Sequence, residues 1–317
     1  MLGSRRTLAA FSFGVVVFGA GCGGSGFGRS TPAAPTTTAP RATVPVVVTH
    51  DPALRAVVVR AVPVTAAAHT ARTSISVTLT GLGDDALSTG AYDIAGSGVV
   101  DLASGDADLK LSIPLYDRLG SGGVIEQRTV RGVAYTKLPA DILAVAGLPP
   151  TVRWLSLDPN QAAAGDPSTL SQSQVDPAGQ LAFLASMSDD VRTMGREPVR
   201  GVTTTHYAAT IDLTKGGGAA NRTAALRRTL ARLGSGVYTK RLAVDVWLDR
   251  VGRARRVVVS VPLDPKAGSS SAGSLPHDSM LRIQGDFYAF GTPVRVTAPP
   301  QSRVRPYSAL RIRTPAA

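Results

Sequence analysis

Short runs of alternating apolar and polar residues dominate the body of the chain, and they predict β-strands. The apolar positions of the two clearest runs are Ile75, Val77 and Leu79 in the first and Leu109, Leu111 and Ile113 in the second. Serine, threonine, aspartate and lysine fill the positions around them. A period of two places alternate side chains on opposite faces of a strand, so we expect each strand to bury one face and to expose the other.

Two hairpins and several further strands extend this pattern into a sheet. One turn is predicted at Ser104-Gly105 and the other at Arg131-Gly132. The hairpins join residues 98–102 to 108–113 and residues 124–130 to 133–138, and further strands are predicted at residues 153–158, 202–213, 242–249, 255–263 and 280–290. Most connections are too short for parallel crossovers, so we expect a large and mostly antiparallel sheet.

Two segments of helical composition lie before and between these strands in the sequence. Residues 52–68 form the first, and Pro63 should break or kink it. The second spans residues 221–233, where leucines share one face, arginines lie mostly off it, and Gly234 ends the helix. Its arginines could meet lipid headgroups, although a plain solvated helix face is the simpler explanation.

A third helix begins at the capping pair Asp176-Pro177. Its apolar positions, at helical spacing, are Leu181, Leu184 and Met187. With so few helices between so many strands, the sequence predicts an α+β fold, in which a large, mostly antiparallel sheet packs on a few helices.

The N-terminus has the pattern of an export signal. Arg5 and Arg6 give a positive start, and residues 7–21 are uncharged and too few to span a bilayer comfortably. Small residues lead into Cys22, a pattern that resembles the lipobox of bacterial lipoproteins, in which the cysteine is lipidated and becomes the mature N-terminus. Gly19 stands where a lipobox usually has leucine.

Lipidation of Cys22 also fits the rest of the chain. Cys22 is the only cysteine, so it has no disulfide partner, and an exposed free thiol would be a liability on an exported protein. Residues 23–28, rich in glycine, would serve as a flexible tether. The alternatives are an ordinary signal peptide cut near Ala20 and, for the export route, a twin-arginine signal at Arg5-Arg6 in place of the general secretory route.

These features divide the chain into four parts. The expected parts are a signal peptide at residues 1–21, a lipidated tether and Pro/Thr-rich linker at 22–51, one domain at 52–297 and a disordered basic tail at 298–317. The tail is expected to be disordered because it is rich in proline and arginine and has no acidic residue.

The net charge of +12 does not indicate a nucleic-acid partner. The basic residues are mostly arginine and are spread along the chain rather than gathered in one patch. An exported protein also meets no genomic DNA. The charge instead favours attraction to an anionic membrane surface.

Catalytic patterns are weak. The four histidines have no second histidine or cysteine at metal-ligand spacing, and the only glutamates are Glu126 and Glu197. We therefore expect a protein without a cofactor or a metal and without enzymatic activity. The enzyme alternative is a hydrolase that uses His206 with scattered aspartate or serine residues.

Three stretches together resemble the LppX/LprA/LprF/LprG-type actinobacterial lipoprotein family, which shares the LolA-like half-barrel. They are residues 130–139 with the following Arg153-Trp154-Leu155, residues 176–187 with 195–213, and residues 244–249 with 255–257. The resemblance covers roughly residues 52–297, and it rests on the order and spacing of these stretches.

This resemblance implies a membrane-anchored envelope protein that binds lipid or an acylated glycolipid in an apolar cavity and carries it across the cell envelope. A shared fold does not fix a function, so this stays an implication of the family. The expected cavity-lining residues are Ile75, Val77, Leu79, Leu109, Leu111, Ile113, Leu181 and Leu184. The same residues could form a solid core, in which case the protein would be a structural or partner-binding lipoprotein with a filled interior. The sequence names no protein partner.

Overall fold

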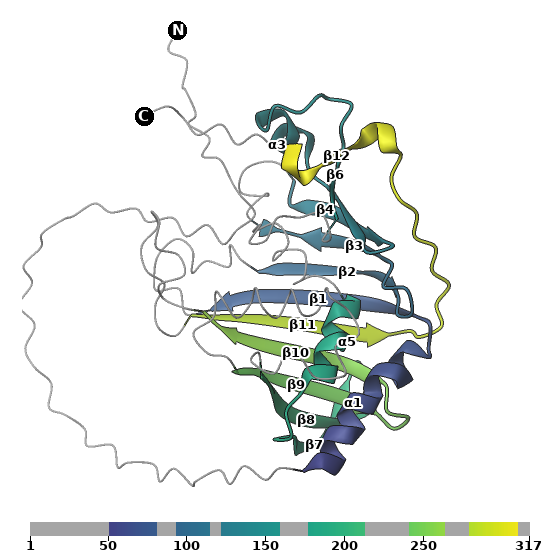
Figure 1. Ribbon diagram of the computed structural model, residues 1–317, viewed down its shortest axis with the longest axis vertical. Coiled ribbons are helices and arrows are strands. Elements are labelled where there is room, and N and C mark those ends of the chain that lie inside the picture. The colour runs from purple at the N-terminus through teal and green to yellow at the C-terminus, as the bar shows by residue number, and fades with distance from the viewer. Residues whose placement is uncertain are drawn as a thin grey trace, which may run out of the picture.

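One twisted sheet makes up most of the described chain (Figure 1). The computed structural model describes residues 51–80, 93–114, 122–158, 177–212, 241–263 and 279–309. Its strands are β1 (Thr70–Thr80), β2 (Ile94–Asp101), β3 (Ala107–Ser112), β4 (Val124–Val130), β5 (Val133–Lys137), β6 (Trp154–Leu157), β7 (Arg192–Val199), β8 (Val202–Asp212), β9 (Arg241–Asp249), β10 (Ala254–Pro262), β11 (Met280–Tyr288) and β12 (Val304–Pro306).

These strands are hydrogen-bonded in the order β12-β6-β5-β4-β3-β2-β1-β11-β10-β9-β8-β7. Every neighbouring pair is antiparallel except β12 and β6, which are parallel. The sheet does not close, because β12 and β7 lie at opposite edges. The predicted α+β fold with a large, mostly antiparallel sheet is therefore confirmed.

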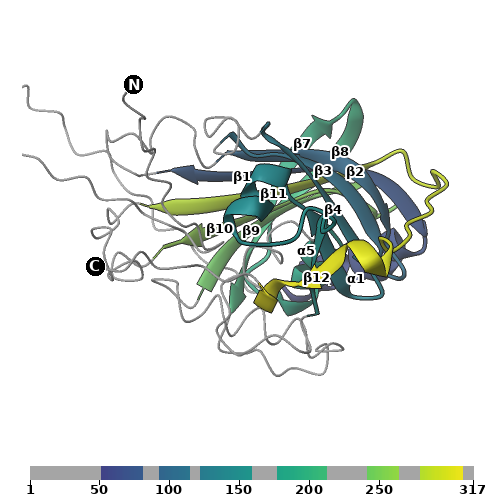
Figure 2. The same cartoon turned by 90° about the horizontal axis from the view of Figure 1, so that it is seen from above.

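Two of the described helices lie across one face of this sheet (Figures 1 and 2). They are α1 (Pro52–Ala66) and α5 (Pro177–Phe183), and α5 continues into the short 3₁₀ helix η1 (Leu184–Ser186). α1 packs against β9 and β10, α5 against β2 and β10, and η1 against α1 and β8. We call this side of the sheet the inner face and the opposite side the outer face.

α1 begins at a capped end and continues through its proline. The Asp51 carboxylate accepts hydrogen bonds from the backbone N–H groups of Ala53 and Leu54, at 2.9 and 3.1 Å. Pro63 lies inside the helix, which extends three residues beyond it to Ala66. Of the break or kink expected at Pro63, the break does not occur.

α5 lies against the sheet at a glycine. Gln180 on α5 is 1% exposed, and its side-chain amide lies over Gly285 of β11. A Cβ at Gly285 would collide with this amide, so the amide would have to move from its buried position. The regular α5 is shorter than predicted, because Met187 lies beyond η1 in an isolated bridge with Ile211.

Two tight turns have the same sequence and the same backbone form. Arg131-Gly132 joins β4 to β5 with φ of 52° and 78°, and Arg200-Gly201 joins β7 to β8 with φ of 49° and 77°. Two successive positive φ values are typical of the type I′ turn, which matches the twist of the strands that it joins. The predicted Arg131-Gly132 hairpin is confirmed by the pairing of β4 with β5.

The C-terminal segment differs from its prediction. Residues 298–317 were expected to be disordered, but η3 (Gln301–Arg303), β12 and η4 (Tyr307–Ala309) are formed, and β12 pairs with β6. Val304 is 7% exposed and packs on Trp154 and Tyr135, and the Arg153 amide donates to the Arg303 carbonyl at 3.0 Å. Apolar burial and strand pairing order this segment despite its proline content.

Two further elements were not predicted, namely β7 and the helix α3 (Ala140–Val145). Other expectations fall outside the described residues, among them Cys22, the helix predicted at residues 221–233 and the capping residue Asp176.

Candidate functional site

The eight predicted cavity residues come together on the inner face. All belong to or pack against one hydrophobic cluster, and all but Leu79 are buried. β1 contributes Ile75, Val77 and Leu79, β3 and the residue after it contribute Leu109, Leu111 and Ile113, and α5 with η1 contributes Leu181 and Leu184. Burial alone suits a solid core as well as a cavity lining.

Strand register makes the inner face a continuous apolar surface. One row of paired residues crosses eight strands and consists of Tyr207, Val246, Val257, Gly285, Ile75, Gly96, Leu111 and Ile125. The next row contains Ala209, Val244, Val259, Ile283 and Val77. Paired residues share a face of the sheet. Neither row contains a charged side chain, so this face is apolar across these strands.

This apolar surface extends beyond the helices that cover it. The main contacts of α1 and of α5 with η1 are to β2, β8, β9 and β10, and Gln180 of α5 also lies over β11, whereas Leu109, Leu111 and Ile125 lie farther along the sheet on β3 and β4. Figure 1 shows the two helices over the lower half of the sheet as drawn. Leu109, Leu111 and Ile125 belong to the hydrophobic cluster and are 1%, 2% and 3% exposed, so the described residues show an apolar layer on this part of the inner face and no open surface.

The outer face has the opposite character. One row of paired residues crosses all twelve strands, and we call it the outer row. It consists of Gly195, His206, Trp247, Arg256, Asp286, Ser74, Ser97, Lys110, Glu126, Lys137, Trp154 and Val304. Polar, charged and aromatic residues predominate in the outer row. The charged side chains of these rows therefore lie on the outer face of the sheet.

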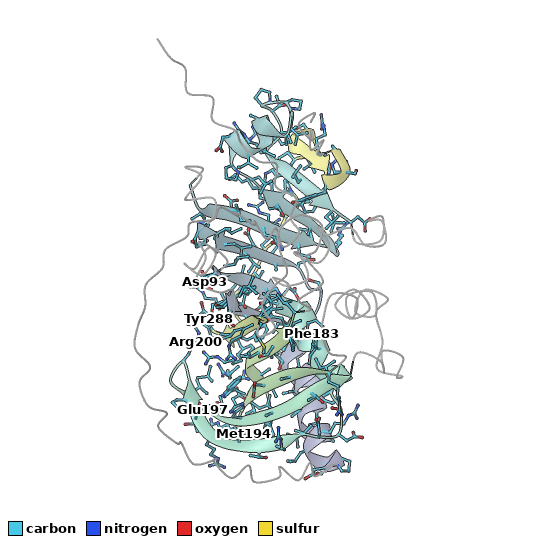
Figure 3. All side chains as sticks on the ribbon, turned by 90° about the vertical axis from the view of Figure 1, so that its left-hand side faces the viewer. Asp93, Phe183, Met194, Glu197, Arg200 and Tyr288 are labelled. Carbon is cyan, nitrogen blue, oxygen red and sulfur yellow. The ribbon has the colours of Figure 1, made fainter. Side chains whose placement is uncertain are left out.

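The middle of the outer row contains a buried carboxylate. Asp286 is 3% exposed and accepts hydrogen bonds from Arg256 Nε and Nη2 at 2.7 and 2.9 Å and from Arg200 Nε at 3.1 Å. Arg200 also donates to Ser74 and stacks on Tyr288, with its guanidinium carbon 4.2 Å from the ring centroid (Figure 3). The hydrogen bonds to Asp286 raise the pKa of Arg256 above its ordinary value, although burial opposes this.

His206 lies farther along the row, between two carboxylates. Its Nδ1 is 3.1 Å from Glu197 Oε1 and its Nε2 is 2.8 Å from Asp245 Oδ1. The imidazole stacks on Trp247 with ring centroids 4.1 Å apart, and the Trp247 indole N–H donates to Glu197. Since carboxylates engage both ring nitrogens, neither nitrogen is placed to accept a proton from a nucleophile. This geometry argues against the hydrolase alternative built on His206.

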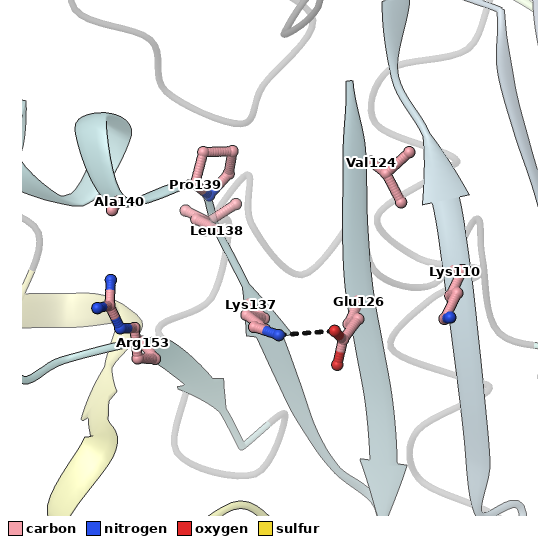
Figure 4. A pocket seen from close by; sticks show the side chains of 8 residues that line it. All are labelled: Lys110, Val124, Glu126, Lys137, Leu138, Pro139, Ala140 and Arg153. Atoms are coloured by element: carbon pink, nitrogen blue, oxygen red, sulfur yellow. Dashed lines mark hydrogen bonds and ion pairs between the residues drawn. The ribbon is translucent and has the colours of Figure 1, made fainter. Parts of the chain in front are cut away.

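The outer face also contains a pocket of about 400 Å³ near the strand ends of β3, β4 and β5 (Figure 4). Its lining residues are Lys110, Val124, Glu126, Lys137, Leu138, Pro139, Ala140 and Arg153. Lys137 Nζ is 2.6 Å from Glu126 Oε1. This pocket could not be predicted from the sequence, because its lysine and arginine residues are far apart in the sequence and only the strand register brings them together.

Among the described residues, no group of three histidine, cysteine, aspartate or glutamate side chains is arranged to hold a metal ion. None of the helices within the described segments is long and apolar enough to cross a membrane.

The fold is similar to several solved structures. Lipoprotein LppX from Mycobacterium tuberculosis aligns with a TM-score of 0.42 and 20% identity, over 78% of this chain and 100% of that chain. LprF from Mycobacterium bovis has a TM-score of 0.42 and 13% identity, over 78% and 98% of the two chains. A DUF1329 family protein from Desulfovibrio piger has a TM-score of 0.30 and 11% identity, over 77% and 95%.

No protein-family model matches the chain, and no curated protein matches its sequence. LppX and LprF are two of the lipoproteins that the three sequence stretches resemble.

Proposed function

We propose that this protein is a membrane-anchored envelope lipoprotein that binds the acyl chains of a lipid or acylated glycolipid against the inner face of its sheet and carries the lipid across the cell envelope. The observation behind this proposal is the continuous apolar inner face, which extends past α1 and α5 onto β3 and β4. The ligand would lie along Leu109, Leu111 and Ile125.

The energetics suit such a ligand. Burial of acyl chain stabilises a complex by about 0.8 kcal/mol for each methylene group. A chain of ordinary length would therefore bind firmly to a surface such as that of Leu109 and Leu111, without a charged anchor on the inner face. The uncharged inner rows avoid the desolvation penalty that a charged side chain beside an acyl chain would bring.

The N-terminus would supply the membrane attachment. In this proposal Cys22 is lipidated on the extracytoplasmic side, and residues 23–51 tether the domain to the membrane. Such a tether would keep the inner face close to the membrane from which a lipid is taken.

Cys22→Ser tests the attachment. We expect the variant to accumulate as an unprocessed precursor or to be released from the membrane, because no thiol remains to receive a diacylglycerol. Fractionation of membranes and mass spectrometry of the intact protein measure this outcome. A variant that matures and partitions into membranes as the wild type does would overturn the lipoprotein assignment.

Ligand binding is tested by mass spectrometry of organic extracts from the purified protein and by uptake of a fluorescent fatty-acyl probe. Val77→Trp and Leu111→Trp place a large ring on the inner face, and Val99→Trp places the same ring on the outer face of β2 as the matched control. We expect both inner-face variants to lower probe uptake severalfold and the control to leave it unchanged.

Unfolding measurements on the same variants separate this proposal from a filled core. In a filled interior, the added ring overpacks the core and lowers the free energy of unfolding by about 1–3 kcal/mol. In a ligand-binding interior, the ring occupies ligand space and changes stability less than it changes uptake. Loss of stability without any lipid in the extract would favour the structural or partner-binding alternative.

A further inference from the structure

We infer that the outer-face pocket between β3 and α3 is a binding site for a phosphate group. We call it the basic pocket, defined by Lys110, Lys137 and Arg153 around Glu126. It lies on the opposite side of the sheet from the proposed acyl-chain surface, and this inference does not rest on the lipid-binding proposal.

Strand register gathers the cations of the basic pocket. Lys110 pairs with Glu126, and Glu126 pairs with Lys137, so the three side chains stand side by side on one face. Neighbouring strands lie about 4.8 Å apart, which places the two lysine backbones roughly 10 Å from each other across Glu126. Arg153 reaches the same pocket from the residue that precedes β6 (Figure 4). These long side chains can converge on a single small anion.

The charges of the basic pocket are not balanced. Among the described residues that line it, Glu126 is the one carboxylate, and it is engaged by Lys137 at 2.6 Å and more distantly by Arg128, whose Nη2 lies 3.8 Å from Glu126 Oε2. Within the described segments, no acidic side chain lies within ion-pair distance of Lys110 or Arg153. The pocket therefore presents two positive charges that the described residues leave unneutralised.

A phosphate group matches this arrangement in charge, size and hydrogen-bonding capacity. It carries up to two negative charges and several acceptor oxygens, which lysine and arginine bind through charge-assisted hydrogen bonds. A pocket of about 400 Å³ has room for the phosphate and for carbon atoms attached to it. Val124, which is 62% exposed, and Pro139 form an apolar wall beside the cations, and this wall suits a phosphate ester better than a free ion.

The test is isothermal titration calorimetry of the purified full-length protein at low ionic strength. Three probes are compared, namely inorganic phosphate, a short-chain phosphatidic acid below its micelle concentration, and the diacylglycerol with the same chains. Low ionic strength is needed because salt screens exposed charges. We expect saturable binding of phosphate, tighter binding of phosphatidic acid and no pocket-dependent binding of diacylglycerol.

Variants assign this binding to the basic pocket. Lys110→Gln with Arg153→Gln should lower phosphate affinity by about tenfold or more, since each substitution removes a charge-assisted hydrogen bond. Glu126→Gln should raise affinity severalfold, because it removes the opposing carboxylate and frees Lys137. Arg60→Gln with Arg282→Gln is the control, because it removes the same charge from exposed positions outside the pocket.

The outcomes divide clearly. An equal loss of phosphate affinity in the pocket variant and in the control would show a response to net charge alone and would overturn the inference. The absence of saturable binding to either phosphate-bearing probe would also overturn it. If the pocket variant fails to fold, the rise in phosphate affinity expected for Glu126→Gln still tests the site. An unchanged or lower affinity in Glu126→Gln counts against the site. Equal affinity for phosphate and phosphatidic acid would identify the free ion as a sufficient ligand, and tighter phosphatidic acid binding would identify a lipid headgroup.

Discussion

At the scale of single residues, a buried aspartate joins elements that are distant in the sequence. Asp286 of β11 binds Arg256 of the neighbouring strand β10 and also Arg200 from the β7–β8 turn. The outer face of a sheet is usually solvated, yet here Val199, Trp247 and Val258 form a small buried cluster beside these charges. The β7–β8 hairpin is therefore fastened to the outer face by both ionic and apolar contacts.

Asp286→Ala tests how much this carboxylate stabilises the fold. The substitution leaves Arg200 and Arg256 without their shared partner, and breaking one side of a buried ion pair typically lowers the free energy of unfolding by about 3 kcal/mol. Urea denaturation of both proteins measures the difference. Asp93→Ala, at an exposed position of the described chain, is the control and should change stability by less than about 0.5 kcal/mol. Similar midpoints for Asp286→Ala and Asp93→Ala would show that the pair contributes little.

At the scale of elements, the turn between β9 and β10 is organised by one carboxylate. Asp249 Oδ1 accepts from the backbone N–H groups of Val251 and Arg253, at 3.1 and 3.0 Å. Its Oδ2 accepts from Arg253 Nε and Arg255 Nε, at 3.1 and 2.9 Å. Both guanidinium groups also lie over the Phe290 ring, so this turn is attached to the chain that follows β11.

This turn should make stability depend on pH. Burial alone would raise the pKa of Asp249, but the hydrogen bonds and charges of Arg253 and Arg255 outweigh it and hold the pKa below its ordinary value of 3.8. The unfolded chain therefore takes up the proton first as the pH falls. The contribution of Asp249 is fully present above about pH 5 and is lost as the pH falls through the folded-state pKa.

Asp249→Asn tests this dependence. We expect the variant to be less stable than the wild type by about 2 kcal/mol at pH 7, because its amide makes weaker hydrogen bonds with the arginines. The difference should shrink between pH 5 and pH 3. Denaturant unfolding at pH 7, 5, 4 and 3 measures it, with Asp93→Asn as the exposed control. A difference of the same size at pH 7 and pH 3 would contradict the assigned role of Asp249.

Much of the strand pattern could be predicted from the sequence, because most strands bury one face and expose the other. β1 and β3 show the alternation clearly, and their predicted positions agree with the structure. β7 was missed because seven of its eight residues are exposed, so no apolar period marks it. β12 was missed because its order comes from pairing with β6 and from contact with Trp154, neither of which composition reveals.

The two edge strands differ from the central ones in ways that protect the sheet. β7 contains Pro198 and a register irregularity between Thr193 and Gly195, and its arginines are exposed. β12 has only three residues and includes Pro306. Bulges, charges, prolines and short length all discourage pairing with another chain, so this open sheet can remain unclosed without joining a neighbour.

At the scale of the whole molecule, the two faces of the sheet have separate chemistry. The residues of the apolar inner face could be predicted from the sequence, because a period of two reveals which residues share the buried face, as for Ile75 and Val77. The outer row could not be found, because a strand sequence does not show which residue of the next strand stands opposite. The register sets Trp247 beside Arg256 and Lys110 beside Glu126, and only the folded chain supplies it.

The C-terminal segment completes this architecture on the side of β6. Val304 of β12 stands opposite Trp154 in the parallel pair, and Arg128 and Lys137 lie over the Trp154 indole, at 5.0 and 5.8 Å from the ring centroid. Trp154 is therefore buried at 6% exposure although it lies on the outer face. Its environment reports directly on whether the segment is docked.

Truncation after residue 297 should undock this edge and expose Trp154. The chain has two tryptophans, so Trp247→Phe leaves Trp154 as the sole indole emitter. In that background we expect the truncation to shift fluorescence emission to longer wavelength, because the indole loses its contact with Val304 and meets water. We also expect it to lower the free energy of unfolding by about 2 kcal/mol, because apolar burial and strand pairing are lost. Truncation after residue 309 keeps β12 and serves as the matched control, with no shift expected. Identical emission maxima and identical unfolding midpoints for the two truncations would show that the segment does not dock on β6 in solution.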